Sequence, residues 1–227
     1  ILLRREGQFL QGTTSTSTNL GLGKLSVYQE GTVNNFAYNY WCSPIGNAST
    51  SSGNSNFGVT LLQQPNTVLN STPAIMLAMN VTNGISNPLS IAPFWIYKFL
   101  SSDDYSQWFA VGTASSILPG EGFTMKGTGG ILDGANPGGV ENEVNNPGSA
   151  QRYDFRGRPN DGAIDITVAN GKFTLTGNPY PSAIDLSAFL TDAVNTSGIA
   201  YFWEQDKSVN SHLILAYRGG YGTFSPV

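Results

Sequence analysis

The sequence contains only one cysteine and one histidine in 227 residues. A single cysteine excludes a framework of intrachain disulfides, and Cys42 is expected to be a small buried side chain. One cysteine and one histidine cannot by themselves supply the three or four ligands of a zinc site. A hydrolytic triad would depend on His212 as its base, and no G-x-S-x-G motif accompanies it. These shortages favour a protein without enzymatic activity.

Charge is also scarce. Asp, Glu, Lys and Arg make up 11% of the residues, against about 25% in ordinary globular domains. The net charge of -4 and the pI near 4.8 argue against binding to nucleic acid, because few cations are present to neutralise phosphates. No apolar run approaches the ~20 residues that cross a bilayer, so no membrane span is expected. Gly, Asn, Ser and Thr take the place of charge, which is typical of a β-rich extracellular protein.

Short alternating segments separated by turn residues run through the whole sequence, and they predict an all-β protein. We expect a single antiparallel β-sandwich domain, jelly-roll-like, over residues 1–227, with one short helix near 183–191. The helix would begin at Ser182, with Asp185 three residues later as in a capping box. The expected strands are 1–11, 24–29, 36–42, 59–62, 74–79, 93–99, 107–111, 122–126, 200–204 and 212–217.

The stretch 153–190 is interpreted as a polar loop, a hairpin and a Pro-rich turn that enters the helix. Residues 164–168 alternate apolar and polar side chains, and 173–175 resume the alternation after Asn170-Gly171. Asn-Gly supplies the positive φ angles of a two-residue hairpin turn. A second long segment, 127–149, is rich in Gly, Asn and Pro without periodicity, and it predicts a functional or mobile loop.

The residue types are compatible with two kinds of ligand site. A calcium ion could bind in the polar loop through carboxylate and amide oxygens, although plain turn chemistry with Arg–Asp pairing also explains it. Exposed tryptophans could instead form a platform for a sugar ring. The candidate calcium ligands are Asp154, Asn160, Asp161 and Asp165, and the candidate sugar-binding residues are Trp95, Trp108 and Trp203.

Carboxylates that could serve a glycosidase occur only in or beside predicted loops. A glycosidase would need two of them facing each other at roughly 5–9.5 Å. The candidates are Asp103 with Asp104, Glu121, Glu141 with Glu143, and Glu204 with Asp206. Solvated charge is the simpler interpretation of each.

Several motifs occur together in order along the chain. They are YWCSP (40–44), PGEGFTMKG (119–127), YDFRGRPNDG (153–162), GNPYPS (177–182), YFWE (201–204) and YRGGY (217–221). Together they resemble a β-rich module of secreted and cell-surface proteins of the Bacteroidetes, especially flavobacteria. The resemblance implies export through the type IX secretion system and a place on the outer surface of a Gram-negative bacterium. It also implies that the chain is part of a larger polypeptide. The resemblance assigns no catalytic residues to this sequence.

The function expected from the sequence is therefore structural or adhesive. A terminal strand over 1–11, anchored by Leu3 and Phe9, could pair with the open sheet edge of another copy or of a neighbouring domain and so build a fibre. A carbohydrate-binding module is the alternative, with glycans as partners. No cofactor is expected apart from the possible calcium ion.

Overall fold

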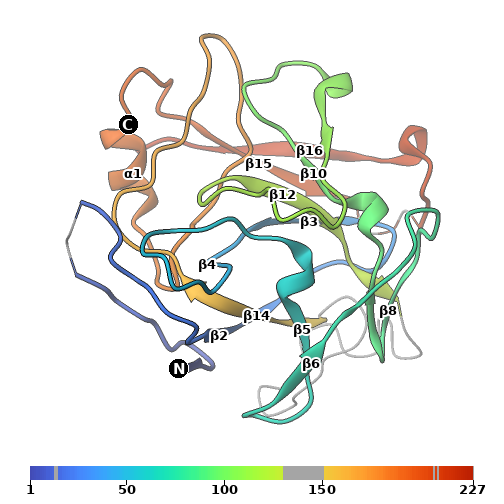
Figure 1. Cartoon of the computed structure of the whole chain (residues 1–227). Helices are drawn as coiled ribbons and strands as arrows, with labels where there is room; N and C mark the ends of the chain where they lie inside the picture. Colours follow the sequence, from blue (N-terminus) through green and yellow to red (C-terminus); the bar gives the residue numbers. More distant parts are fainter. Residues whose placement is uncertain (13–14, 130–150, 207, 209, 227) are drawn as a thin grey trace. The chain divides into compact units, whose positions relative to one another are not determined.

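The computed structural model describes residues 1–12, 15–129, 151–206, 208 and 210–226 (Figure 1). The chain forms two compact units, Ile1–Ser182 and Ala183–Val227. Strands dominate, most sheet pairs are antiparallel, and the described residues contain one α-helix, α1 (Leu186–Asp192). The all-β class and the single short helix predicted from the sequence are confirmed, while the extent of the predicted domain, 1–227, stays a prediction.

The largest sheet of the first unit is built around its longest strand, which Figure 1 draws in amber. The strand order is β1-β2-β14-β5-β6, and β4 pairs with the end of β14. All pairs are antiparallel except β1 with β2. The bounds are β1 (Leu2–Leu3), β2 (Leu25–Glu30), β4 (Ile45–Gly46), β5 (Leu62–Pro65), β6 (Ser71–Pro73) and β14 (Arg152–Pro159).

Two further sheets complete the first unit. One is antiparallel in the order β11-β10-β12-β3, and the other is mixed in the order β13-β8-β9-β7. The first contains β3 (Tyr38–Cys42), β10 (Tyr97–Lys98), β11 (Phe109–Ala110) and β12 (Gly122–Lys126). The second contains β7 (Ile75–Met76), β8 (Gly84–Ser86), β9 (Leu89–Ile91) and β13 (Thr128–Gly129).

The core of the first unit lies between the large sheet and the β11-β10-β12-β3 sheet. Phe57 stacks on Phe123 of β12 and on Phe155 of β14, with ring centroids 5.5 and 5.6 Å apart. Trp41 of β3 contacts Tyr153 and Phe155 of β14, both at 5.7 Å. Aromatic side chains from two sheets therefore fill one apolar layer, which is the packing of a β-sandwich.

The segment interpreted as a polar loop is in fact the central strand. β14 covers Arg152–Pro159, and its backbone pairs with both β2 and β5. The prediction was wrong because the charges and turn residues were taken to indicate a loop, although the expected Arg–Asp pairing is present. Arg152 pairs with Glu30, and Arg156 with the fully buried Asp154. These partners satisfy the charges within the sheet.

The predicted hairpin has a turn at Asn170-Gly171 but not its strands, and Asn170 lacks the positive φ that was expected of it. Gly171 has a φ of +69°, and the Lys172 N–H donates to the Ala169 carbonyl. The flanking residues find partners elsewhere: Phe173 exchanges two backbone hydrogen bonds with Ser102, and the Leu175 N–H donates to the carbonyl of Phe99. Tertiary backbone partners thus replace the local pairing that the alternation predicted.

The strand expected over residues 1–11 is confined to Leu2–Leu3, where β1 pairs with β2 of its own chain. Leu3 and Phe9 are half-buried and pack against the core of the first unit. Residues 59–61, 93–95 and 214–216, expected as strand, form short 3-10 helices instead. Most of the predicted loop 127–149 lies outside the described residues, although its first residues include β13.

The second unit contains α1 and a two-stranded antiparallel ribbon. Helix α1 is capped by Asp185, whose carboxylate accepts a hydrogen bond from the Ala188 N–H at 3.1 Å, so the cap lies three residues after the expected Ser182. The ribbon pairs β15 (Ala200–Gln205) with β16 (Gly219–Phe224). The strand over 200–204 is confirmed, whereas the one over 212–217 is wrong because β16 begins later.

Candidate functional site

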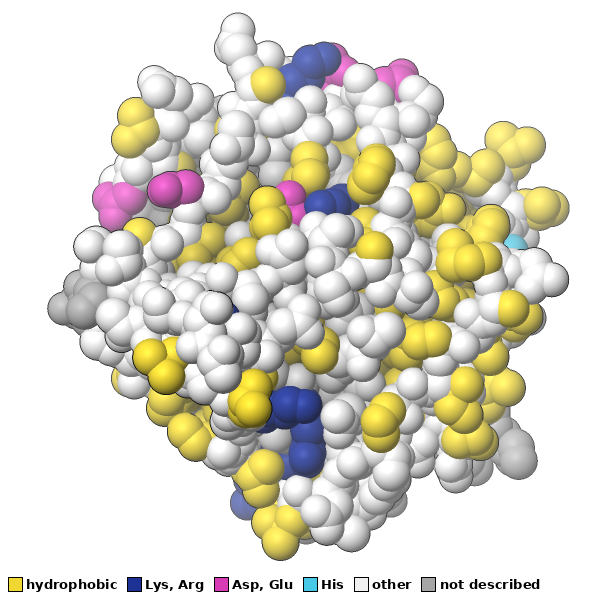
Figure 2. Space-filling view, in the orientation of Figure 1, with side chains coloured by type: hydrophobic (Ala, Val, Ile, Leu, Met, Phe, Trp, Pro, Cys, Tyr) yellow, Lys and Arg dark blue, Asp and Glu magenta, His cyan; other side chains and the backbone are white. Residues whose placement is uncertain are grey.

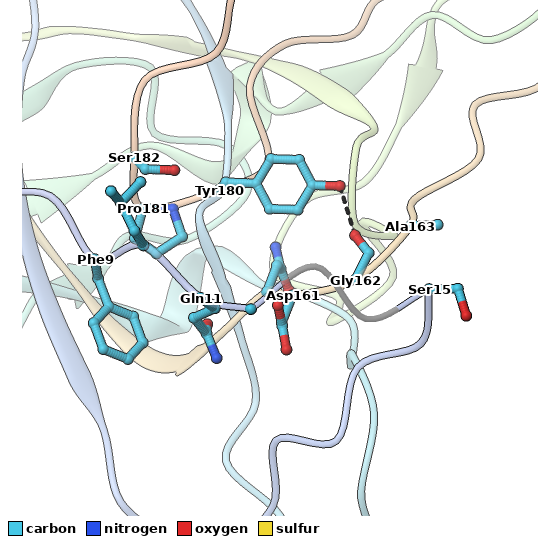
Figure 3. Close-up of a pocket in the computed structure, with 12 residues that line it drawn as sticks. Phe9, Gln11, Ser15, Asp161, Gly162, Ala163, Tyr180, Pro181 and Ser182 are labelled. Atoms are coloured by element: carbon cyan, nitrogen blue, oxygen red, sulfur yellow. Dashed lines mark hydrogen bonds between the residues drawn. The ribbon is translucent and has the colours of Figure 1, made fainter.

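A groove of about 400 Å³ lies in the first unit, where three segments that are distant in sequence meet (Figure 3). Its walls are residues 9–12 of the N-terminal segment, residues 160–163 after β14, and residues 180–182, with Ser15 also contributing. Figure 3 shows Phe9 and Ser15 toward opposite ends, with Asp161 and Tyr180 between them. The groove therefore joins the two motifs YDFRGRPNDG and GNPYPS.

Asn160 and Asp161 are held where β14 ends. The Asn160 side-chain amide donates hydrogen bonds to the carbonyls of Ser43 and Pro179, both at 3.0 Å. The backbone of Asp161 is held by one side chain, because its N–H donates to Asn54 Oδ1 and its carbonyl accepts from Asn54 Nδ2. This wall is consequently anchored without using the Asp161 carboxylate.

Only glycine fits at the next position. Gly162 has a φ of +74°, and a Cβ there would lie 2.6 Å from the backbone nitrogen of Ser17. The N-terminal segment therefore runs directly against this turn, and the Ala163 N–H donates to the Ser15 carbonyl at 3.0 Å. The glycine of the PNDG sequence thus permits a close backbone approach.

Tyr180 and Pro181 form the opposite wall. The Tyr180 N–H donates to Asn178 Oδ1, and its hydroxyl donates to the Gly162 carbonyl at 2.7 Å (Figure 3). Burial raises the pKa of Tyr180, and the charges of Asp161 and Asp165 raise it further. The Phe9 N–H donates to the Pro181 carbonyl at 2.8 Å. Hydrogen bonds therefore tie all three walls together.

The lining offers unpaired acceptors beside apolar surface. The Oδ1 atom of Asn160 has no hydrogen-bond partner, but it is closed to solvent and is not open to a ligand in the groove. Asp161 is only 7% exposed, and its carboxylate has no hydrogen bond or ion pair within the described part of the chain. Phe9 and Pro181 add apolar surface to the same groove. A buried acceptor without a donor is costly, so this arrangement is suited to a ligand that donates hydrogen bonds.

The structure separates the predicted calcium ligands. Asn160 and Asp161 both line the groove, but Asp154 lies inside β14, where its oxygens accept hydrogen bonds from Ser26, Ser71 and Arg156. Asp165 is exposed and is not among the lining residues. Within the described ranges no three His, Cys, Asp or Glu residues come together as metal ligands. Calcium binding by the full predicted set would require Asp154 to give up its present partners.

The three tryptophans of the predicted platform each pack against other residues of the chain. Trp95 is buried, and its Nε1 donates to the Thr82 carbonyl at 2.8 Å. Trp108 is half-buried against Phe99, with ring centroids 4.9 Å apart, and Trp203 lies in the second unit against Tyr221 at 5.0 Å. Burial of Trp95 leaves its ring facing protein atoms, so it offers no open face to a sugar.

Three of the predicted carboxylates have structural roles. Glu121 forms an ion pair with the buried Lys98 at 2.7 Å, and Asp103 pairs with Lys172. Asp104 caps the 3-10 helix Tyr105–Gln107. Glu141 and Glu143 lie outside the described residues, and Glu204 and Asp206 belong to the second unit. Cys42 is half-buried in β3, and burial raises its pKa to about 12.

Lys126 of β12 lies against the Trp95 ring. It is 4% exposed, and its Nζ is 3.7 Å from the ring centroid of Trp95. Burial lowers the pKa of Lys126 to about 7, while attraction of the ammonium to the ring favours the charged form. The free energy of unfolding should consequently depend on pH through this lysine.

We expect the stability of the native protein relative to a Lys126→Met variant to rise between pH 7 and 10. An unfolded lysine has a pKa near ~10.4, above the folded value of about 7. Over that range the unfolded state binds more protons, so stability rises with pH. Urea unfolding of both proteins at pH 7, 8.5 and 10 measures the difference. Parallel pH curves for the two proteins would contradict this prediction.

Sequence reasoning selected Asn160 and Asp161 but missed the residues opposite them. Tyr180, Pro181 and Ser182 were interpreted as a rigid entry to the helix, and Gln11 was not selected. A usable signal was nevertheless present, because the two most specific motifs of the sequence supply two of the three walls. Phe9 was selected as part of an assembly strand, and it lines the groove.

Comparison with known proteins gives one match. The family model described as "Domain of unknown function (DUF8693)" matches residues 1–221, which include the whole first unit and most of the second. No curated protein and no solved structure matches the chain. Separately, none of the helices in the described ranges is both long and apolar enough to cross a membrane.

Proposed function

Because the chain belongs to the domain family of unknown function DUF8693, we propose from its own chemistry that it is a non-enzymatic adhesive module of a bacterial extracellular surface protein. The single observation that carries the proposal is the groove between residues 9–12, 160–163 and 180–182. It is held in shape by hydrogen bonds among its own walls. A preformed concave site of this kind is typical of ligand binding.

The groove supports binding rather than turnover. Its lining residues include one carboxylate, Asp161, and no histidine, cysteine or lysine. General acid–base or nucleophilic catalysis needs a second group within reach of the first. The Tyr180 hydroxyl donates to a backbone carbonyl, and burial raises its pKa, so it stays protonated near neutral pH and does not accept a proton as a general base. A ligand held here would be bound without being changed.

A location outside the cell is supported by the resemblance to surface modules of the Bacteroidetes and by the nature of the surface. On the face drawn in Figure 2, charged side chains are few, and most of the surface consists of white atoms (backbone and other side chains) with hydrophobic side chains among them. We extend the proposal to the outer surface of a Gram-negative bacterium, with export by the type IX system. Pairing of the N-terminal strand with another copy is less favoured, because β1 already pairs with β2 of its own chain.

The proposal is tested by coating fluorescent beads with the chain. We expect the beads to adhere to bacterial or host extracellular polymers, immobilised as separate polysaccharide and protein surfaces. The supernatant should contain no released sugars or peptides, because the groove lacks a catalytic pair. Beads coated with the chain after heat denaturation are the control. Release of products, or adhesion no greater than that of the control beads, would overturn the proposal.

A further inference from the structure

We infer that the groove binds one pyranose unit of a neutral saccharide, with the Asp161 carboxylate as its main hydrogen-bond acceptor. The inference rests on the proposed adhesive function and gives it a ligand class. Three properties of the groove support it, namely its volume, its unpaired acceptors and its apolar walls. Each of them uses described residues of the first unit.

The volume favours a small organic ligand. At about 400 Å³, the groove falls within the roughly 300–1,000 Å³ of small-molecule sites. A lone calcium ion would leave most of this space unfilled. It would also lack ligands, because Asp161 is the one acidic residue of the lining and calcium takes about 6–8 oxygens.

The acceptors favour hydroxyl groups. Asp161 is 93% buried, and its carboxylate is unpaired within the described ranges. A hydroxyl that donates to the carboxylate would form a charge-assisted hydrogen bond, stronger than a neutral one. The Tyr180 hydroxyl uses its proton on the Gly162 carbonyl, and its lone pairs remain able to accept a second hydroxyl proton. A ligand with several neighbouring hydroxyl donors matches this set.

The apolar walls select among such ligands. Phe9 and Tyr180 are half-buried, so part of each ring is accessible, and Pro181 lies between them in the lining. A pyranose has a face of C–H groups that can cover an apolar ring surface while its equatorial hydroxyls point sideways. Simple polyols supply donors without such a face. The combination of one flat apolar contact and lateral acceptors therefore indicates a sugar ring.

The test begins with the whole chain on a printed array of neutral oligosaccharides. Glycans that bind are then titrated by calorimetry as free ligands, and calcium chloride alone is titrated in parallel. We expect at least one neutral glycan to bind without added calcium. Binding should weaken by about tenfold or more in Asp161→Asn, because a hydrogen bond to a charged group is lost. Asp192→Asn, an exposed carboxylate of helix α1, is the matched control and should bind as the native chain does.

A second variant keeps the test decisive if Asp161→Asn unfolds. Ala163 is exposed and lines the groove, so the large side chain of Ala163→Trp is expected to occupy the groove and to abolish binding. The inference is overturned if no neutral glycan on the array binds, if calcium alone binds, or if either folded groove variant binds glycan as well as the native chain. Adhesion of coated beads to glycan-free protein surfaces, without glycan binding, would overturn the saccharide while keeping the adhesive function. Glycan binding without adhesion of the beads would overturn the adhesive function while keeping the saccharide as the ligand.

Discussion

Replacing Asp154 with alanine should lower the free energy of unfolding by about 3–5 kcal/mol, the usual cost of breaking a buried ion pair by removing one partner. The Asp154 side chain is fully buried in β14, and its oxygens accept hydrogen bonds of 2.5 Å from Ser26, Ser71 and Arg156. Alanine would leave an arginine that is 19% exposed, and two hydroxyls, without their acceptor. Equilibrium unfolding in urea, followed by tryptophan fluorescence, measures the loss.

Asp103→Ala is the matched control for this experiment. Asp103 pairs with Lys172, but the two side chains are 46% and 33% exposed. Exposed pairs typically contribute about 0–1 kcal/mol, so this variant should unfold close to the native midpoint. Equal losses in the two variants would contradict the interpretation that burial within β14 makes the Asp154 pair important.

The sequence predicted best those strands that are rich in apolar or aromatic residues. In β2, Leu25 is buried and the strand ends at the exposed Glu30, while β12 carries the buried Phe123 and Met125. All five residues of β12 are buried, and Ser26 is buried beside Leu25 in β2, so apolar content rather than alternation identified these strands. An aromatic run likewise marks β3, although its polar Asn39 is buried and its Tyr40 is exposed.

Prediction from the sequence failed where the hydrogen-bond partners of a segment lie far away along the chain. Asp154 is satisfied by Ser26, 128 residues away, and by Ser71, 83 residues away. No local pattern contains that information, so a strand with four charged residues resembled an exposed loop. The 173–175 segment shows the opposite error, because its alternation was real but its backbone partners are Phe99 and Ser102 rather than residues 164–168.

The groove contains residues that the sequence predicted and residues that it did not. Asn160 and Asp161 were selected because their residue types suit ligand binding, and they line the groove. Their neighbours were not predicted, because Phe9 and Tyr180 reach the site through single contacts, the Phe9 N–H to the Pro181 carbonyl and the Tyr180 hydroxyl to the Gly162 carbonyl. Residue chemistry was therefore readable from the sequence, whereas the shape of the site depended on how the segments pack.

Phe155→Ala is the second variant with a large expected effect, a loss of about 3–5 kcal/mol in the free energy of unfolding. Phe155 is fully buried at the centre of β14. Its ring stacks on Phe57 at 5.6 Å and contacts Trp41 at 5.7 Å, so it connects the two sheets of the sandwich. Alanine removes most of that surface and leaves a cavity that rigid strands cannot close. Urea unfolding again gives the measurement.

Phe109→Ala, in the edge strand β11, is the control, because its side chain is 61% exposed and surface changes usually stay within about 0.5 kcal/mol.

Phe155→Ala should also weaken binding in the groove as denaturant is added, because Asn160 and Asp161 directly follow β14. Binding should then be lost at the same urea concentration as the fluorescence signal. If binding persists after the sandwich of Phe155→Ala has unfolded, the groove does not depend on β14, and the assignment of this strand as its support is wrong.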